Sequence, residues 1–112
     1  MNCLKGDVVL FPYPFSNLTG RKVRPAVIVG KTSSNSSDVF IVPLTSRTNN
    51  LAEGEFVLFD TKQAGLNVIS AVKRGCFLVD RQLTISKIGK LSSRDLLLLE
   101  NSLRNWLDLQ KA

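Results

Sequence analysis

The chain has 112 residues and a formal net charge of +6, from 15 Lys and Arg against nine Asp and Glu. Hydrophobic residues make up 44% and charged residues 21%, which is typical of a folded domain and excludes a disordered chain. No apolar run approaches the roughly 20 residues of a membrane span, and the first residues lack the apolar core of a signal peptide. We therefore expect one domain, residues 1–112, in a cytoplasmic protein without a membrane partner.

The first predicted strand covers residues 6–15 and is followed by a polar, basic loop over residues 16–22. Its residues are mostly β-branched or aromatic, and turn residues bound it, as is typical of a strand. Its two prolines cannot donate to a sheet, so they must lie at the end or the open edge of the strand. A second strand begins at Arg24, where Pro25 restricts the backbone to extended geometry and directs the Arg24 side chain to one face.

Further strands are predicted at residues 39–42, 55–60, 68–72 and 76–79, with polar loops at 31–38 and 46–50. From residue 91 the apolar spacing changes to three and four, which predicts an amphipathic helix. Ser92 or Ser93 is its expected N-cap, and Asp95 suits the first turn. The apolar stripe of this helix comprises Leu96, Leu99, Leu103, Trp106 and Leu107. The predicted fold class is mainly β with a terminal helix (α+β), a small curled antiparallel sheet packed by the helix.

Several kinds of chemistry are excluded because the chain contains no His. Triad hydrolases, ribonucleases that use a pair of histidines and zinc sites built on His all need imidazole. The nine carboxylates are scattered, and the one close pair, Glu53 and Glu55, is interpreted as a solvated face. Cys3 and Cys76 lack metal-type spacing and are expected to be unpaired, with Cys76 buried. We therefore expect no metal site and no cofactor.

The functional groups that remain for chemistry are cations and hydroxyls. The positive net charge indicates an acidic partner such as nucleic acid. RNA carries its own nucleophile, since the 2′-OH can attack the adjacent phosphate. A protein accelerates that reaction by holding the strand in line and stabilising the phosphorane charge. Arg24 offers a planar, permanently charged fork for phosphate oxygens. Thr45, and also Ser46, offers a hydroxyl donor at a strand end.

Two sequence motifs carry a family resemblance. They are Gly6-Asp7 through Pro14-Phe15 with Arg24-Pro25-Ala26, and Val42-Pro43-Leu44-Thr45-Ser46. Both resemble the MazF/PemK ribonuclease toxins of toxin–antitoxin pairs. The resemblance implies an SH3-like antiparallel barrel of the CcdB/MazF kind. It also implies a homodimer that cleaves single-stranded RNA without a metal and is neutralised by an acidic, disordered antitoxin segment. Arg24 and Thr45 match the catalytic pair of the family.

The chain departs from the family where many members carry an acidic residue. The matching region, residues 70–76, has Lys73 and Arg74 and no acid before Asp80. Lys73 and Arg74 either bind RNA phosphates or form a solvated turn, and Phe15 either stacks on an unpaired base or packs in the core. The candidate RNA-binding residues are Phe15, Asn17, Arg21, Lys22, Arg47, Ser70, Lys73 and Arg74.

Two alternative functions stay open. A toxin of the same barrel architecture can inhibit DNA gyrase without cutting anything, by means of apolar residues near its C-terminus. The second alternative is a barrel that binds RNA or a protein and has no catalytic activity. The Arg24 and Thr45 motifs favour the nuclease.

Overall fold

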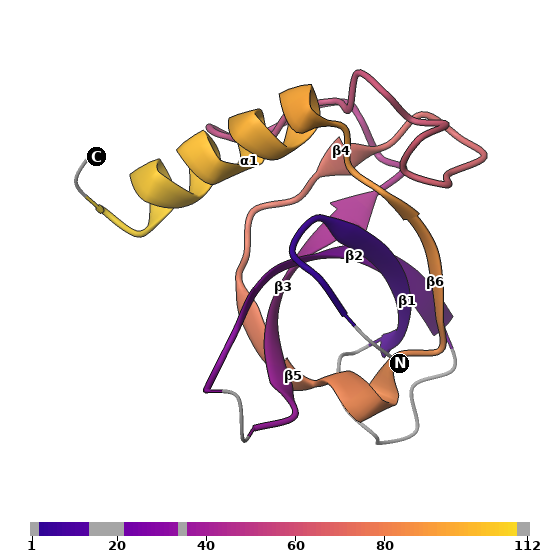
Figure 1. The fold of residues 1–112 in the computed structure, drawn as a ribbon. Coiled ribbons are helices and arrows are strands. Elements are labelled where there is room, and N and C mark those ends of the chain that lie inside the picture. The colour runs from indigo at the N-terminus through magenta and orange to yellow at the C-terminus, as the bar shows by residue number, and fades with distance from the viewer. Residues whose placement is uncertain (1–2, 14–21, 34–35, 110–112) are drawn as a thin grey trace.

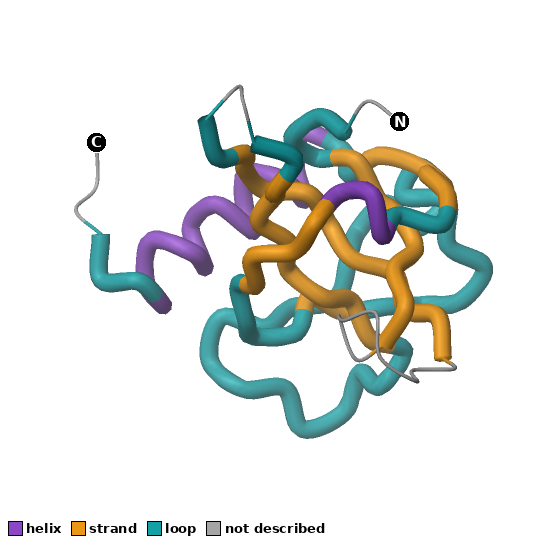
Figure 2. Tube along the Cα trace, turned by 90° about the horizontal axis from the view of Figure 1, so that it is seen from below, coloured by secondary structure: helices purple, strands orange, loops and turns teal. Residues whose placement is uncertain are grey.

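The computed structural model describes residues 3–13, 22–33 and 36–109. Its elements in chain order are β1 (Asp7–Tyr13), β2 (Lys22–Lys31), β3 (Asp38–Thr45), β4 (Ala71–Val72), β5 (Phe77–Asp80), the 3-10 turn η1 (Arg81–Leu83), β6 (Ser86–Lys90) and α1 (Ser93–Trp106). The strands curl around a ring with α1 lying across one side (Figure 1). The view turned by 90° places α1 to one side of the strands, with its C-terminal end pointing away from them (Figure 2). The predicted fold class is confirmed.

All strand pairs are antiparallel, in the order β4-β3-β2-β1-β6. Strand β5 also pairs with β3, along Asp38–Ile41, whereas β4 pairs with its other end at Leu44 and Thr45. The register shifts between Val8 and Val9 and again between Ile28 and Gly30. Such bulges increase the local twist, which is how so short a sheet curls on itself.

The curled sheet has a separate apolar cluster on each face. The inner cluster includes Phe11, Ala26, Ile28 and Ile41, while the cluster toward α1 includes Val8, Val27, Val42, Leu44 and Leu99. Residues of one strand contribute alternately to the two clusters, as the period of two in a strand requires. The central strands β1, β2 and β3 are therefore apolar on both faces.

The predicted strand over residues 55–60 was wrong, since only a single bridge, Val57 to Ala71, forms there. The backbone N–H groups of Phe59 and Asp60 donate to the carboxylate of Asp95, both at 2.9 Å, and not to a partner strand. The strand predicted over residues 68–72 shortens to β4, because the Ser70 hydroxyl turns back to donate to the Val68 carbonyl at 3.0 Å. In both segments, hydrogen bonds to groups outside a strand ladder compete with strand pairing.

Strand β6 was not predicted, because its sequence Ser-Lys-Ile-Gly-Lys has little β propensity. It pairs with β1 from Asp7 to Leu10, and the turn at residues 64–65 packs directly against its backbone. Gly65 has a φ of +79°, and a Cβ added there would come 1.9 Å from the Ile88 carbonyl oxygen. Only glycine allows this contact.

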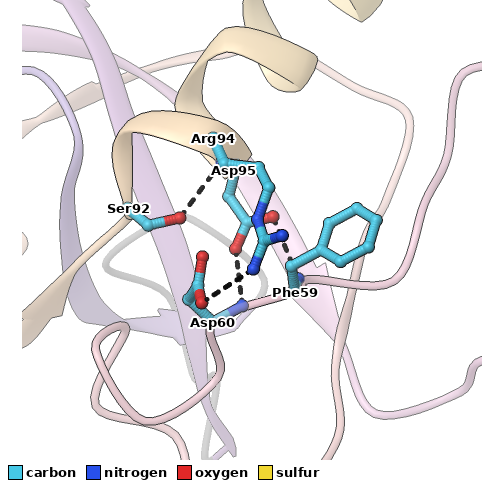
Figure 3. A network of polar contacts seen from close by, with 5 residues as sticks. All are labelled: Phe59, Asp60, Ser92, Arg94 and Asp95. Carbon is cyan, nitrogen blue, oxygen red and sulfur yellow. Dashed lines mark hydrogen bonds and ion pairs between the residues drawn. The ribbon is translucent and has the colours of Figure 1, made fainter.

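Helix α1 begins as predicted, with Ser92 as the N-cap whose hydroxyl accepts the N–H of Asp95 at 3.2 Å. Asp95 does more than favour the helix dipole, because it is fully buried and accepts the backbone N–H groups of Phe59 and Asp60 (Figure 3). Arg94 pairs with Asp60 at 3.2 Å and lies 4.5 Å above the Phe59 ring. The Ser92 hydroxyl, and then Arg94, lower the pKa of Asp60.

The predicted apolar stripe of α1 is largely confirmed. Leu99 is buried and Leu96, Leu103 and Trp106 pack against the same cluster, but Leu107 lies beyond the helix and is exposed. The helix also contacts the loop at residues 53–54. The Trp106 indole N–H donates to the Glu53 carbonyl at 2.9 Å, and the Ser102 hydroxyl donates to the Gly54 carbonyl at 2.7 Å.

The prediction that Cys76 is the buried thiol was wrong. Cys3 is buried and Cys76 is exposed, and neither forms a disulfide. No helix among residues 3–13, 22–33 and 36–109 is long and apolar enough to cross a membrane.

Candidate active site

The two motifs meet where β2 begins and β3 ends. In the antiparallel register of these strands, Lys31 is opposite Val39 and Ala26 is opposite Pro43. Continuing that register by two residues brings Arg24 opposite Thr45. On its other side Arg24 pairs with Phe11 of β1. By alternation Arg24 and Thr45 project from the inner face of the sheet, but at its open end. The Arg24 side chain is exposed and that of Thr45 half-buried.

Arg24 and Thr45 line the same hollow, whose volume is about 260 Å³. Ser46 and Arg47 add to its polar lining, and Leu44, Leu66 and Val68 supply apolar surface. A lining with both cations and apolar side chains suits a nucleotide, because the phosphate can bind the cations and the base can cover the apolar side chains. We call this hollow the Arg24 pocket.

The hydroxyl of Thr45 is oriented by its own loop. Its oxygen accepts the backbone N–H of Arg47 at 3.1 Å, closing a short turn after β3. An accepted hydrogen bond leaves the hydroxyl proton available as a donor. The Thr45 side chain can therefore donate to an oxygen that lies between it and Arg24.

A second hollow, of about 480 Å³, shares Thr45 and Arg47 with the Arg24 pocket. Asn49, Asn50, Glu55 and Lys73 line the rest of its polar surface. We call it the Glu55 pocket. Two neighbouring pockets with a common wall resemble two subsites for consecutive units of one chain molecule.

Glu55 is the residue that sequence analysis missed, since it is not part of a solvated face. Its two carboxylate oxygens accept the N–H groups of Ala52 and Arg74, at 2.7 and 2.8 Å. The backbone N–H of Arg74 is the main cause of the lowered pKa of Glu55; the N–H of Ala52 and the charges of Lys73 and Arg74 add to it. A carboxylate therefore does lie beside Lys73 and Arg74, supplied by a loop that folds back from 18 residues earlier. Only its proximity in the folded chain identifies Glu55, because no local sequence pattern links it to Lys73 and Arg74.

Asp80, the first acid after Lys73, lies at the other end of β3. Its carboxylate accepts the Ser37 hydroxyl at 3.0 Å and the Gln82 N–H at 2.9 Å, and it pairs in register with Asp38. It is therefore remote from Thr45. The part of the chain that the structure describes contains no group of three or more Cys, Asp or Glu that could hold a metal ion.

The other predicted RNA-binding residues are distributed as follows. Arg47 and Lys73 line the pockets, and Ser70 lines the Arg24 pocket but is buried, with its hydroxyl bound to its own loop. Lys22 is exposed at the first position of β2 and Arg74 is exposed beside Glu55, and neither lines these two pockets. Phe15, Asn17 and Arg21 lie outside the described residues.

Solved structures of toxins share this fold. The Mycobacterium tuberculosis toxin MazF-mt6 is 21% identical, with a TM-score of 0.72 over 94% of this chain and 99% of its own. MazE–MazF from Deinococcus radiodurans gives 17% identity and a TM-score of 0.74 over 95% and 96%. A mycobacterial endoribonuclease in complex with its cognate antitoxin gives 16% identity and a TM-score of 0.74 over 99% and 100%.

A search of curated protein sequences gives no significant match. The sequence profile of the PemK-like, MazF-like toxins of type II toxin–antitoxin systems matches residues 4–107, nearly the whole chain and both motifs that meet at the Arg24 pocket. The chain therefore belongs to the PemK-like, MazF-like family of type II toxins.

Proposed function

We propose that the protein is an endoribonuclease toxin that cleaves single-stranded RNA without a metal ion. The observation that carries the proposal is that Arg24 and Thr45, from two different strands, line one pocket. A guanidinium and a hydroxyl placed on either side of a phosphate stabilise the charge that develops as the phosphorane forms. Family membership and the endoribonuclease of the same fold support this function.

The reaction uses the nucleophile of the substrate. The 2′-oxygen attacks the adjacent phosphorus, the bond to the 5′-oxygen breaks, and the products are a 2′,3′-cyclic phosphate and a 5′-hydroxyl. The 2′-hydroxyl gives its proton to solvent and the departing 5′-oxygen takes one up. Arg24 acts by electrostatic stabilisation, since a guanidinium stays protonated near neutral pH and is a poor base. DNA lacks the 2′-OH and is left intact.

The direct test incubates the purified protein with unstructured RNA in EDTA and analyses the end groups. We expect cleavage to a cyclic phosphate, no cleavage of DNA, and a loss of at least about 100-fold in rate for Arg24→Ala. Arg24→Lys keeps the charge but not the planar fork, so it should recover only part of the rate. Intact RNA beside a working positive control would refute the proposal. Weaker, salt-dependent binding by Arg24→Ala without any cleavage by the parent would indicate a binding module instead.

The partners follow from charge and fold. The net charge of +6 favours an acidic, disordered antitoxin segment that covers the pockets, as well as RNA itself. Two of the similar structures are complexes of a toxin with its antitoxin. We include in the proposal a homodimer that acts in the cytoplasm. Sedimentation of the purified protein tests the dimer, and a peptide rich in Asp and Glu should compete with RNA for it.

Inhibition of DNA gyrase is the second candidate. Leu107 and Leu109, after the end of α1, are 52% and 57% exposed, and a gyrase poison of this architecture uses apolar residues near its C-terminus. The Arg24 pocket has no purpose in that function. Inhibition of supercoiling by the protein, with RNA left intact, would replace the nuclease by this candidate.

A further inference from the structure

We propose that the Glu55 pocket is a base-selective subsite, in which the Glu55 carboxylate accepts a hydrogen bond from an exocyclic amino group and so favours cytosine over uracil. This inference rests on the proposed function, because it places a second nucleotide of the same RNA strand next to the one that is cut. The occupant follows from three properties of the pocket: its position, its charge and the geometry of its acceptor.

Position makes the pocket an extension of the Arg24 pocket. Thr45 and Arg47 line both hollows, so a chain bound at one continues directly into the other. Its volume of about 480 Å³ is ample for one base, and comparable with small-ligand sites of about 300–1,000 Å³. Leu51 supplies apolar surface within it, against which one face of a base can pack.

The charges in the pocket are divided between two tasks. Arg47 and Lys73 give it two cations against the single carboxylate of Glu55, so a polyanion is still attracted. The cations suit phosphate oxygens, which carry no information on sequence. The carboxylate repels phosphate and is therefore left to contact the base.

The acceptor is held in a fixed orientation. Both oxygens of Glu55 already receive a backbone N–H, from Ala52 on one side and Arg74 on the other. Each carboxylate oxygen has a second acceptor site, so two remain for a ligand. Because the same two N–H bonds favour the ionised form, the group accepts and does not donate.

A fixed acceptor discriminates between the pyrimidines. Cytosine carries an amino donor at C4, whereas uracil carries a carbonyl oxygen there, and a carboxylate is the side chain that accepts from the cytosine amino group. Uracil would place two acceptors face to face. The amides of Asn49 and Asn50 can both donate and accept, so they complete the contacts of either base without choosing between them.

The test measures binding, so that it does not depend on cleavage. Short fluorescent 2′-O-methyl oligonucleotides of cytidine or of uridine block the 2′-oxygen, and their Kd values are measured by anisotropy at one ionic strength. We expect the parent protein to bind the cytidine oligonucleotide about tenfold more tightly. Glu55→Gln should reduce this ratio to within about twofold, because an amide can also donate to the uracil carbonyl.

Glu53→Gln is the matched control, since it removes the same charge only two residues away. The Glu53 side chain is exposed and does not line the pocket. This variant should keep the tenfold ratio. Equal affinity of the parent for the two oligonucleotides, or an unchanged ratio in Glu55→Gln, would overturn the inference. The first of these outcomes needs no variant and so does not depend on whether Glu55→Gln folds.

The two proposals fail separately. A cytidine preference that Glu55→Gln removes, with unmodified RNA left intact in EDTA, would reject the nuclease and keep the base subsite. Cleavage of RNA by a protein whose oligonucleotide binding shows no cytidine preference would reject the subsite alone.

Discussion

The hydroxyl of Thr45 accepts the backbone N–H of Arg47 at 3.1 Å, which restricts the side chain and leaves the hydroxyl proton free to donate elsewhere. A side chain at the end of a strand normally has freedom to rotate. Here the turn after β3 removes part of that freedom and leaves a donor beside Arg24. The proposed chemistry therefore depends on the γ-oxygen and not on the shape of the side chain.

The first prediction concerns this oxygen. Thr45→Val keeps the β-branched shape but has no hydroxyl, so the rate of RNA cleavage should fall by about 100-fold or more, as when a donor to a developing oxyanion is removed. Thr45→Ser retains the hydroxyl and should stay within about tenfold of the parent. Single-turnover cleavage of one RNA measures both. Equal rates for the Val and Ser variants would remove Thr45 from the reaction.

The second prediction concerns Asp95, which joins α1 to the loop that carries the pockets. Asp95→Ala leaves the part-buried N–H groups of Phe59 and Asp60 without their acceptor, and hydrogen bonds to charged groups contribute about 1.5–3 kcal/mol each. We expect the free energy of unfolding to fall by about 3–5 kcal/mol in urea titrations. Arg94→Ala, which breaks an exposed pair with Asp60 and the contact with the exposed Phe59 ring, should cost far less. Equal losses for the two variants would contradict this account.

The third prediction concerns Trp106. Because this side chain is only partly buried, Trp106→Ala should cost about 2–3 kcal/mol, below the range of about 3–5 for fully buried tryptophans. Trp106→Phe keeps most of the packing and loses the hydrogen bond to the Glu53 carbonyl, so it should cost about 1 kcal/mol. Thermal unfolding measures both values. A melting temperature that Trp106→Ala leaves unchanged would show that the indole does not support the loop.

The fourth prediction compares two glycines. Gly65→Ala combines a φ of +79° with a Cβ 1.9 Å from the Ile88 carbonyl oxygen, so the backbone of β6 must move. We expect a large loss of stability, of more than about 2 kcal/mol. Gly30→Ala is the control, because its Cβ would meet Phe40 at an ordinary 3.8 Å. If the two variants have the same melting temperature, the contact between residue 65 and β6 is not tight.

The fifth prediction concerns pH. The pKa of Glu55 is lowered from its ordinary value of 4.5, chiefly by the N–H of Arg74, so its ionised form is stabilised by folding. That stabilisation is fully present above pH 4.5 and is lost as the pH falls through the lowered pKa. Glu55→Gln should therefore be less stable than the parent at pH 7, and the difference should close in strong acid. Unfolding curves at several pH values test this, and a gap that is constant with pH would contradict it.

Much of the strand framework was predictable. The apolar runs from Val8 to Phe11 and from Val39 to Val42 are short and rich in β-branched residues, and they form β1 and β3, each of which contributes side chains to both apolar clusters. The helix was equally clear, since Ser92 caps it and the leucines recur with its period. Strand β6 and the failed strand at residues 55–60 were not predictable. Partners distant in the chain decided both, the first through pairing with β1 and the second through capture of two N–H groups by Asp95.

The same division holds for the pockets. Residue type and motif spacing determined which cation and which hydroxyl to consider, because a guanidinium fork and a strand-end hydroxyl are properties of Arg24-Pro25 and of Leu44-Thr45-Ser46 themselves. Only the tertiary structure decided that these groups share a hollow and that Glu55, from a distant loop, lines the hollow next to it. The physical reason is that side-chain chemistry is local, whereas the meeting of side chains depends on sheet register and on loop hydrogen bonds, which the whole chain sets together.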